Sequence, residues 1–340
     1  MQLFKRFIED LTTHALNLYK DKLHHKTFVL EDLLIEAYFS DKNYADLCEA
    51  NLVHIKELPH SHDKITLYLL DSKSLNWPPP PRWFEPNYNR HIATNAFQKL
   101  HLWGSYLDHP RVWQCFDPKT NIGIQLIKEP EAMIPWESGG PLRHFLHWAY
   151  QGQGKLLCHA ASLGMKNSGL LLIGPGGAGK SGTTLAGISH GLQTVGDDYC
   201  LIDPKGPSAF ALFQIIKQDP EGLERITLPI DKTDKLQINW QNKYEIHRSQ
   251  LTSNAFVSFL NINALVILKI AKVSRCHLKL SSAGEAMKAW ALSSSFQLPD
   301  HEKESITCIS RLCKSLPIFE LTLSQDTADI SETIRKMLKL

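Results

Sequence analysis

The sequence has few of the features that mark secreted, membrane or nucleic-acid-binding proteins. Its seven cysteines are widely spaced and include no C-x-x-C pair, which argues against a disulfide framework or a zinc site and fits a reducing compartment. The formal net charge is only +2, too small to indicate a nucleic-acid or membrane partner. The longest apolar runs, near 170–173 and 264–268, have the length of strands and are too short to span a bilayer. We therefore expect a soluble, cytoplasmic protein.

The chain has 340 residues, enough for one large domain or two ordinary ones. Segment 1–40 has the apolar spacing of helices, and the strand-like stretches that follow it lie at 64–71, 111–117 and 122–127. Segment 141–152 is typical of a helix, with proline in its first turn and glycine at its end. We place the main boundary at this helix, which gives an N-terminal α+β region, 1–140, and a second domain, 141–340.

The second domain is predicted to be α/β, with a central sheet. Two buried stretches, 155–163 and 170–174, should form a hairpin-like pair of strands that leads into a glycine-rich loop. Further strands are expected at 264–270 and 318–323, and helices at 284–292, at 305–316 and at the C-terminal end.

The glycine-rich loop fits the phosphate-binding pattern G-x-x-x-x-G-K-[ST] in full. Glycines let successive backbone N–H groups point at phosphate oxygens, and the following helix N-terminus adds partial positive charge. Lys180 supplies a cation for the β- and γ-phosphates, and the Ser181 hydroxyl can bind Mg²⁺. ATP and Mg²⁺ are thus the expected cofactors, and the predicted nucleotide-binding residues are Gly174, Gly176, Gly177, Ala178, Gly179, Lys180, Ser181, Gly182 and Thr183.

Chain lengths predict that two aspartates return to this loop. A helix over 180–190 carries the chain about 16 Å away, at about 1.5 Å per residue, and Gly191 is a natural stop. Segment 192–196 can bring it back about 16 Å, at about 3.3 Å per residue. Asp197 and Asp198 then lie beside the phosphates, where one carboxylate can help to hold Mg²⁺ and the other can accept a hydroxyl proton. This arrangement suits transfer to an alcohol as well as to water.

The stretch 155–200 resembles the HPr kinase/phosphorylase family, whose P-loop kinase domain is related in fold to phosphoenolpyruvate carboxykinase. The likeness covers the loop motif, the short helix after it and the strand that ends in Asp-Asp. The family also places a histidine on the strand two before the loop, where CHAA supplies His159 here. The resemblance implies that residues 141–340 form a P-loop domain of this type.

The resemblance also implies a role for each matching residue. Lys180 would bind phosphate, and Asp198 would be the catalytic base. His159 would be an active-site residue close to that carboxylate; the alternative is a histidine satisfied within the core. We expect Ser181 and Asp197 to hold the metal.

The sequence departs from the family in three places. Gly182 stands where these kinases usually have glutamate. Their further acidic metal ligand has no secure counterpart, and Glu221 and Glu224 are the candidates. The downstream glycine-rich motif and the arginine that are linked to the phosphorylase reaction are missing, so reverse dephosphorylation is not predicted.

Outside this core, the chain looks more like the HPr-kinase-like proteins of lasso-peptide and similar peptide-modification clusters. The resembling pieces are PLRHFLHWAYQGQGKLLCHAASL, ALFQIIK with Lys217, AWALSSSFQLP and SLPIFELTL. Some of those proteins look like kinases of a precursor-peptide serine, which makes an ATP-dependent serine kinase the leading hypothesis. Lys217 either reaches a nucleotide phosphate or is a solvated strand end.

Two other functions remain open. The protein could be an NTPase switch that controls a partner protein, or a kinase of a small-molecule alcohol. We expect a homo-oligomer, because closed assemblies are common, and no nucleic-acid or membrane partner.

Overall fold

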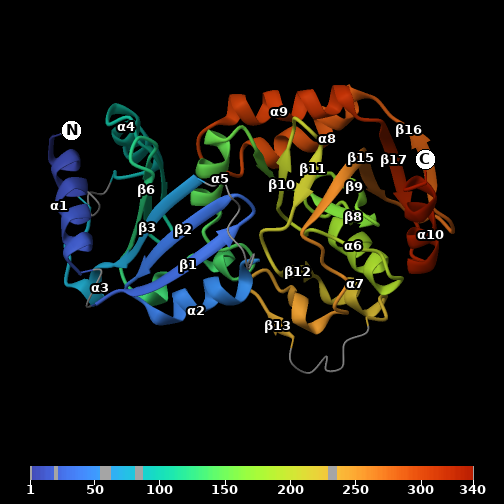
Figure 1. The fold of residues 1–340 in the computed structure, drawn as a ribbon. Coiled ribbons are helices and arrows are strands. Elements are labelled where there is room, and N and C mark those ends of the chain that lie inside the picture. The colour runs from blue at the N-terminus through green and yellow to red at the C-terminus, as the bar shows by residue number, and fades with distance from the viewer. Residues whose placement is uncertain (1, 19–21, 54–62, 81–86, 229–235, 340) are drawn as a thin grey trace. The chain divides into compact units, whose positions relative to one another are not determined.

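The computed structural model describes residues 2–18, 22–53, 63–80, 87–228 and 236–339. The chain forms two compact units, residues 1–152 and 153–340 (Figure 1). The strand-like stretches predicted in the first unit are confirmed.

The first unit has one six-stranded sheet in the order β1-β2-β3-β6-β5-β4. The pairs β2–β3 and β3–β6 are parallel and the other pairs are antiparallel. Its elements are α1 (Gln2–Leu18), β1 (His24–Leu30), β2 (Leu33–Phe39), α2 (Lys42–Asn51), β3 (Asp63–Asp71), α3 (Ser72–Leu75), α4 (Arg90–Lys99), β4 (Trp103–Leu107), β5 (Val112–Asp117), β6 (Ile122–Ile127), two 3₁₀ turns (Pro130–Ala132 and Pro135–Ser138) and α5 (Arg143–Gly152).

The prediction of helical structure throughout 1–40 is wrong for its second half. Helix α1 forms, but β1 and β2 pair as an antiparallel hairpin in which Leu30 lies opposite Leu33. On β2 the fully buried side chains Ile35, Ala37 and Phe39 alternate with less buried ones, which is the period of a strand. Short apolar runs fit either period, so the sequence alone did not separate the two.

Helix α5 belongs to the first unit, so the unit boundary lies after this helix rather than before it. Phe145 packs closely on Gly123 of β6: a Cβ atom on Gly123 would lie only 2.8 Å from the Phe145 ring. Trp148 stacks on Phe116 of β5 with ring centroids 6.4 Å apart. Burial of these side chains fixes α5 on the sheet, because each large aromatic contributes about 2–3 kcal/mol when it leaves water.

The second unit is built on an eight-stranded sheet with a three-stranded sheet beside it. The large sheet has the order β16-β17-β15-β11-β10-β7, with β9 paired to β15 and β8 paired to β9; the small one has the order β12-β14-β13. The strands are β7 (Leu156–Cys158), β8 (Ala161–Met165), β9 (Ser168–Ile173), β10 (Cys200–Asp203), β11 (Ser208–Phe210), β12 (Ile215–Gln218), β13 (Gln237–Ile238), β14 (Tyr244–His247), β15 (Phe259–Ile270), β16 (His277–Leu280) and β17 (Ile318–Leu323).

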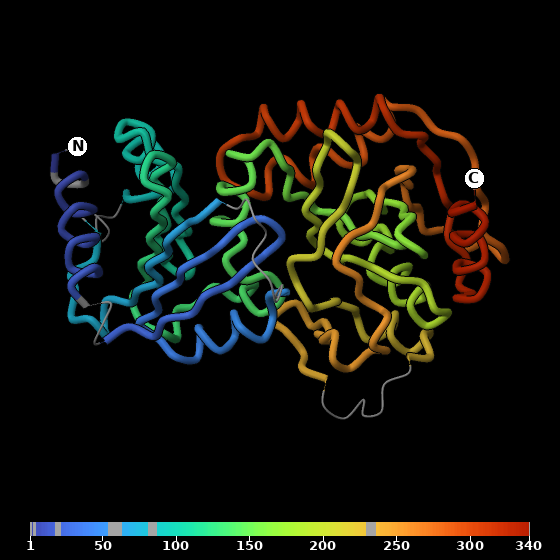
Figure 2. Tube along the Cα trace, viewed as in Figure 1, coloured from blue at the N-terminus to red at the C-terminus, as the bar shows by residue number. Residues whose placement is uncertain are grey.

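Helices cover this sheet and confirm the predicted α/β class. They are α6 (Lys180–Ser189), α7 (Pro220–Glu224), α8 (Ala283–Ser295), α9 (Glu302–Ser315) and α10 (Thr327–Met337), with a 3₁₀ turn at Arg248–Gln250. Leucines of β9 pack in one apolar cluster with residues of α6 and α10. These two helices lie next to each other near the C-terminal end of the trace in Figure 2. Helices α8 and α9 lie side by side in Figure 1.

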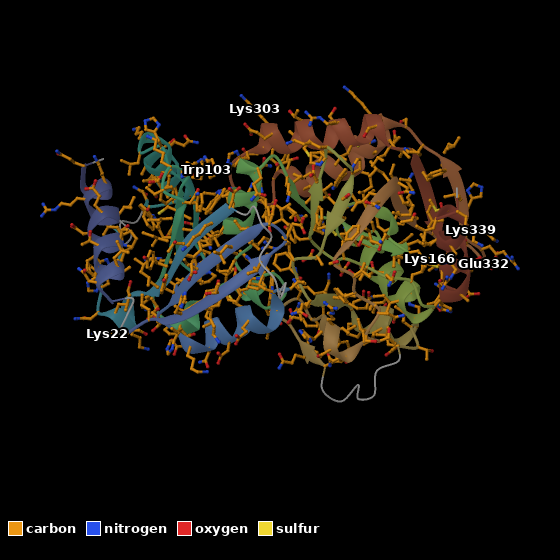
Figure 3. All side chains as sticks on the ribbon, in the orientation of Figure 1. Lys22, Trp103, Lys166, Lys303, Glu332 and Lys339 are labelled. Carbon is orange, nitrogen blue, oxygen red and sulfur yellow. The ribbon has the colours of Figure 1, made fainter. Side chains whose placement is uncertain are left out.

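Charged side chains lie exposed on the surface, and the cysteines form no disulfides, as their spacing predicts. Lys166, Lys303 and Glu332 are exposed and point outward in Figure 3. All seven cysteines are unpaired, and burial raises the pKa of Cys115 to about 12. Within the described ranges, none of the helices combines the length and apolar character that a membrane crossing needs.

One buried histidine should make the stability of the first unit depend on pH. The His144 Nδ1 lies 2.6 Å from Gln114 Oε1, and the Gln114 amide donates onward to Gln125. Burial, reinforced by the charge of Arg143, lowers the pKa of His144 well below its ordinary value. The folded chain therefore keeps His144 neutral, while the unfolded chain protonates it below about pH 6.5.

We predict that the free energy of unfolding falls between pH 7 and pH 5, with His144 contributing up to about 1.4 kcal/mol per pH unit. In His144→Gln this contribution is lost, so urea denaturation at several pH values should give a flatter profile than wild type. Parallel profiles for the two proteins would contradict the prediction.

Candidate active site

The glycine-rich loop joins β9 to α6, as the sequence predicts. Strand β9 pairs in parallel with β15, so both strands end at the same edge of the sheet. Gly177 has φ +80° and Gly179 has φ +96°, a region that glycine enters without a steric penalty. A Cβ on Gly179 would also lie 2.7 Å from Leu323 Cδ1. The loop can therefore curl tightly against the sheet edge only with glycine at these positions.

Lys180 begins α6 and is buried. Its Nζ donates to the carbonyl oxygens of Gly174, at 2.8 Å, and Pro175, at 3.1 Å. Burial lowers the pKa of this ammonium, and the negative charges of Asp197 and Asp198 oppose that change. The lysine thus lies over the loop, within the field of both aspartates.

The chain returns from α6 as the predicted lengths require. Gly191 has φ +80° and ends the helix, with Leu192 N donating to Gly187 O at 2.9 Å. Segment 192–196 is extended and makes single bridges to Gly164 and Phe256 rather than forming a strand. It leads directly to the two aspartates.

Asp198 is the centre of a tight and strained turn. Tyr199 N donates to Asp197 O at 2.9 Å, and Asp198 between them has φ +71°. This three-residue bond with positive φ at the centre is the rare form of the γ-turn. For a residue with a side chain such a backbone costs about 1–3 kcal/mol, and strain of this kind concentrates at functional sites.

Two basic side chains contact the Asp198 carboxylate. His159 Nε2 lies 3.3 Å from Oδ1, and Lys217 Nζ lies 3.3 Å from Oδ2. His159 is at the break between β7 and β8, which form two strands where the sequence predicted one. Its backbone N–H donates to Ser294 Oγ of α8 at 3.1 Å. The structure therefore brings His159 and Asp198 together as predicted, and Lys217 is buried rather than solvated.

Asp197, unlike the partly exposed Asp198, is buried. Burial raises its pKa, as does the charge of Asp198, while Ser181, Lys180 and the Lys217 backbone N–H offset part of the rise. Its Oδ2 accepts from Lys217 N at 3.4 Å. Its Oδ1 has no hydrogen-bond partner among the described residues. A buried carboxylate oxygen of this kind is a suitable cation ligand, because a bound cation would stabilise the ionised form.

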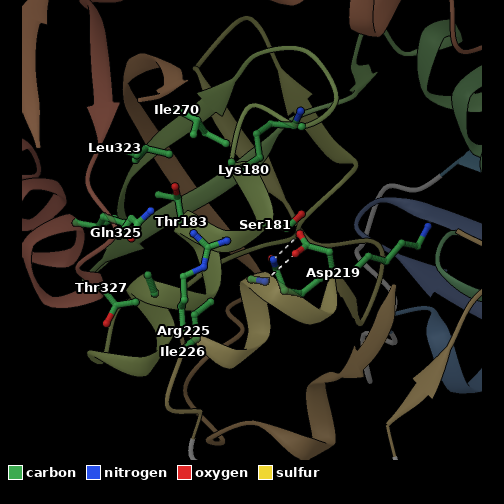
Figure 4. Close-up of a pocket in the computed structure, with 18 of the residues that line it drawn as sticks. Lys180, Ser181, Thr183, Asp219, Arg225, Ile226, Ile270, Leu323, Gln325 and Thr327 are labelled. Atoms are coloured by element: carbon green, nitrogen blue, oxygen red, sulfur yellow. Dashed lines mark hydrogen bonds between the residues drawn. The ribbon is translucent and has the colours of Figure 1, made fainter. Parts of the chain in front are cut away.

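One cavity of about 510 Å³ is bordered by most of these residues, though not by Asp197. Its wall includes the polar side chains of His159, Asp198 and Lys217, together with Lys180 and Ser181 of the loop. It also includes apolar side chains from the carboxyl ends of β15 and β17, Ile270 and Leu323 (Figure 4). Ile270 is 67% exposed although it belongs to the cavity wall. The cavity can therefore accept a ligand with a polyanionic part and a flat or apolar part.

Several wall residues were not predicted from the sequence. They include Gln218, Asp219, Arg225 and Gln325. The candidates for a further acidic ligand, Glu221 and Glu224, are exposed and do not line the cavity, whereas Asp219 does. The sequence signal that could have found Asp219 is its place directly after the strand that contains Lys217.

The residues fit a divalent cation that is shared with a phosphate ligand. Among the described residues no three His, Cys, Asp or Glu side chains cluster as a complete metal site. Mg²⁺, however, is commonly held by one or two carboxylates together with waters and substrate phosphates. The unpaired Asp197 Oδ1 and the neighbouring Ser181 hydroxyl are donors of the oxygen type that this ion prefers.

The chain shows little similarity to known proteins. No protein-family model matches it, and no curated protein matches it. Among solved structures it is similar to the HPr(Ser) kinase/phosphatase from Coxiella burnetii, with 12% sequence identity and a TM-score of 0.30, over 54% of this chain and 93% of that one. The functional proposal therefore rests on the geometry of the site.

The strained turn gives a test that is independent of activity. Asp198→Gly and Asp198→Ala both remove the carboxylate and its contacts with His159 and Lys217, but only glycine relieves the positive φ. We predict that Asp198→Gly is more stable than Asp198→Ala by about 1 kcal/mol in urea denaturation. Equal stability, or a more stable alanine variant, would show that the turn is not strained.

Proposed function

We propose that the protein is an ATP-dependent kinase of the HPr kinase-like P-loop type that phosphorylates a serine hydroxyl on a peptide or protein. One observation carries this proposal: Asp198 is held between His159 and Lys217, at 3.3 Å from each, in the cavity that also contains the phosphate-loop residues. A carboxylate fixed beside a phosphate loop is the arrangement that a hydroxyl acceptor requires.

The polar and apolar residues of the cavity wall orient the nucleotide. The phosphates bind to the backbone of the loop at the start of α6, with Lys180 as their cation. The base packs against apolar wall residues such as Ile270 and Leu323. The γ-phosphate then faces Asp198, which lines the same cavity.

The residues of this chain act mainly by positioning and by neutralising charge. The serine hydroxyl oxygen bonds to the γ-phosphorus, and Asp198 accepts the proton of that hydroxyl. The bond between the γ-phosphorus and the β-phosphate oxygen breaks at the same time, so that ADP leaves. His159 and Lys217 keep the carboxylate in place. Lys180 offsets the charge that develops on the phosphate oxygens. Mg²⁺, held by Ser181 and Asp197, supplies further charge neutralisation when bound.

Helix α8 supports a peptide as the acceptor. Its Ser294 accepts the hydrogen bond of His159 N, and Leu292 and the following Phe296 are 70% and 59% exposed. Neither residue lines the cavity, so a peptide that buried them would extend beyond it, which a small alcohol could not do. The finer proposal of a lasso-type precursor peptide as the substrate rests on the resemblance of the outer segments. We also propose that the activity takes place in the cytoplasm.

A second function fits one feature of the site. The Asp198 side chain is 31% exposed, so water can reach it as well. With water as the acceptor, the same residues would form an NTPase switch that acts on a partner protein. The nature of the acceptor decides between this function, a kinase of a small alcohol and the proposed kinase.

We predict that Asp198→Asn lowers phosphoryl transfer by about 10²–10⁴-fold, because the amide cannot accept the proton, and that it leaves ATP binding largely intact. The measurement is transfer of label from γ-labelled ATP to a serine peptide encoded by a neighbouring gene. Asp203→Asn is the matched control: Asp203 lies at the end of β10, outside the residues that line the cavity, and this variant should transfer at the wild-type rate.

Two results would contradict the proposal. Normal transfer by Asp198→Asn would show that the assigned base is wrong. Free phosphate that is unaffected by any hydroxyl acceptor would favour the NTPase switch.

A further inference from the structure

The end of β12 brings polar side chains to the phosphate loop. The backbone N–H of Lys217 donates to Asp197 Oδ2 at 3.4 Å, which ties this strand to the returning segment. The next two residues, Gln218 and Asp219, both line the cavity. Asp219 and Ser181 are both labelled on the cavity wall in Figure 4.

The Asp219 carboxylate is fixed by two hydrogen bonds. Its Oδ1 accepts from Gly222 N at 2.7 Å, as the N-cap of α7, and its Oδ2 accepts from Gln218 Nε2 at 2.9 Å. Each carboxylate oxygen has a second lone pair that these contacts leave available. The group is thus oriented by protein donors while it still borders the cavity.

Gln218 has an oxygen without a partner. Its side chain is buried, with 5% of the residue exposed, and its Oε1 has no hydrogen-bond partner among the described residues. A Cβ on Gly182, in the first turn of α6, would lie 3.7 Å from this oxygen. A Cβ on Gly222 would lie 1.7 Å from Nε2, so only glycine at that position admits the amide. A buried carbonyl oxygen left unpaired is costly and indicates a ligand.

We propose that Gln218 and Asp219 complete the oxygen shell of the divalent cation that Ser181 and Asp197 hold with the nucleotide. This inference rests on the proposed nucleotide-binding function. Asp219 supplies a second negative charge, and Gln218 supplies the neutral oxygen. Carboxylate, amide and hydroxyl oxygens together are the donor set that Mg²⁺ and Mn²⁺ prefer.

The cap and the metal roles of Asp219 can be separated. Asparagine caps a helix as well as aspartate does, so Asp219→Asn keeps α7 but removes the charge from the cation site. Glu221→Gln, on the same helix, removes an exposed charge that does not line the cavity, and it serves as the matched control.

The experiment is a Mn²⁺ titration followed by electron paramagnetic resonance, with a non-hydrolysable ATP analogue present. Asp219→Asn should weaken Mn²⁺ binding about tenfold or more, and Gln218→Leu should weaken it less. Glu221→Gln should bind Mn²⁺ as wild type does. Thermal denaturation of each variant checks the fold, and binding of the analogue in chelator should be the same in all four proteins.

The two proposals fail in different ways. If wild type binds Mn²⁺ with the analogue and Asp219→Asn binds it equally well, the assignment of Asp219 is overturned and the proposed function stands. If wild type binds neither the analogue nor Mn²⁺, the nucleotide-binding function fails, and this inference fails with it.

Discussion

The site depends on one carboxylate that is held in an unfavourable backbone conformation. Asp198 occupies a γ-turn with φ +71°, and the contacts of His159 and Lys217 with its two oxygens offset part of the strain. These three residues come from the end of the segment returning from α6, from the break between β7 and β8, and from the end of β12. The turn is thus stable only where three separate parts of the second unit meet.

The same geometry gives the two neighbouring aspartates different environments. Asp197 is buried, with a raised pKa, while the Asp198 side chain is partly exposed between His159 and Lys217. Two adjacent acids in one environment would disfavour each other's ionisation. Their different burial and contacts let one serve a cation and the other an acceptor hydroxyl, which is the division of labour that phosphoryl transfer requires.

Local features of this site could be predicted from the sequence because they depend on short-range geometry. The loop motif fixes Lys180 and Ser181, and the lengths of α6 and segment 192–196 bring Asp197 and Asp198 back. Residues of β12 could not be placed in this way, because the contact between Lys217 and Asp198 depends on where β12 lies in the tertiary structure, which no local pattern reveals.

The errors elsewhere have similar causes. The hairpin over 24–39 and the place of α5 in the first unit were set by packing against a sheet whose strand order no local pattern reveals. Short apolar runs fit a helix as well as a strand, and only their neighbours in the sheet decide between the two. The position of Asp219 on the cavity wall likewise depends on the pairing of β12 with β14.

The central claim is that the Asp198 carboxylate faces the terminal phosphate of a nucleotide on the loop. A crystal structure of the chain with Mg²⁺ and a non-hydrolysable ATP analogue tests this most directly. The account predicts the β-phosphate on the loop, the base near Ile270 and the γ-phosphate on the side of Asp198, with room for a hydroxyl between them. A γ-phosphate directed away from Asp198, or a nucleotide bound outside this cavity, would contradict it.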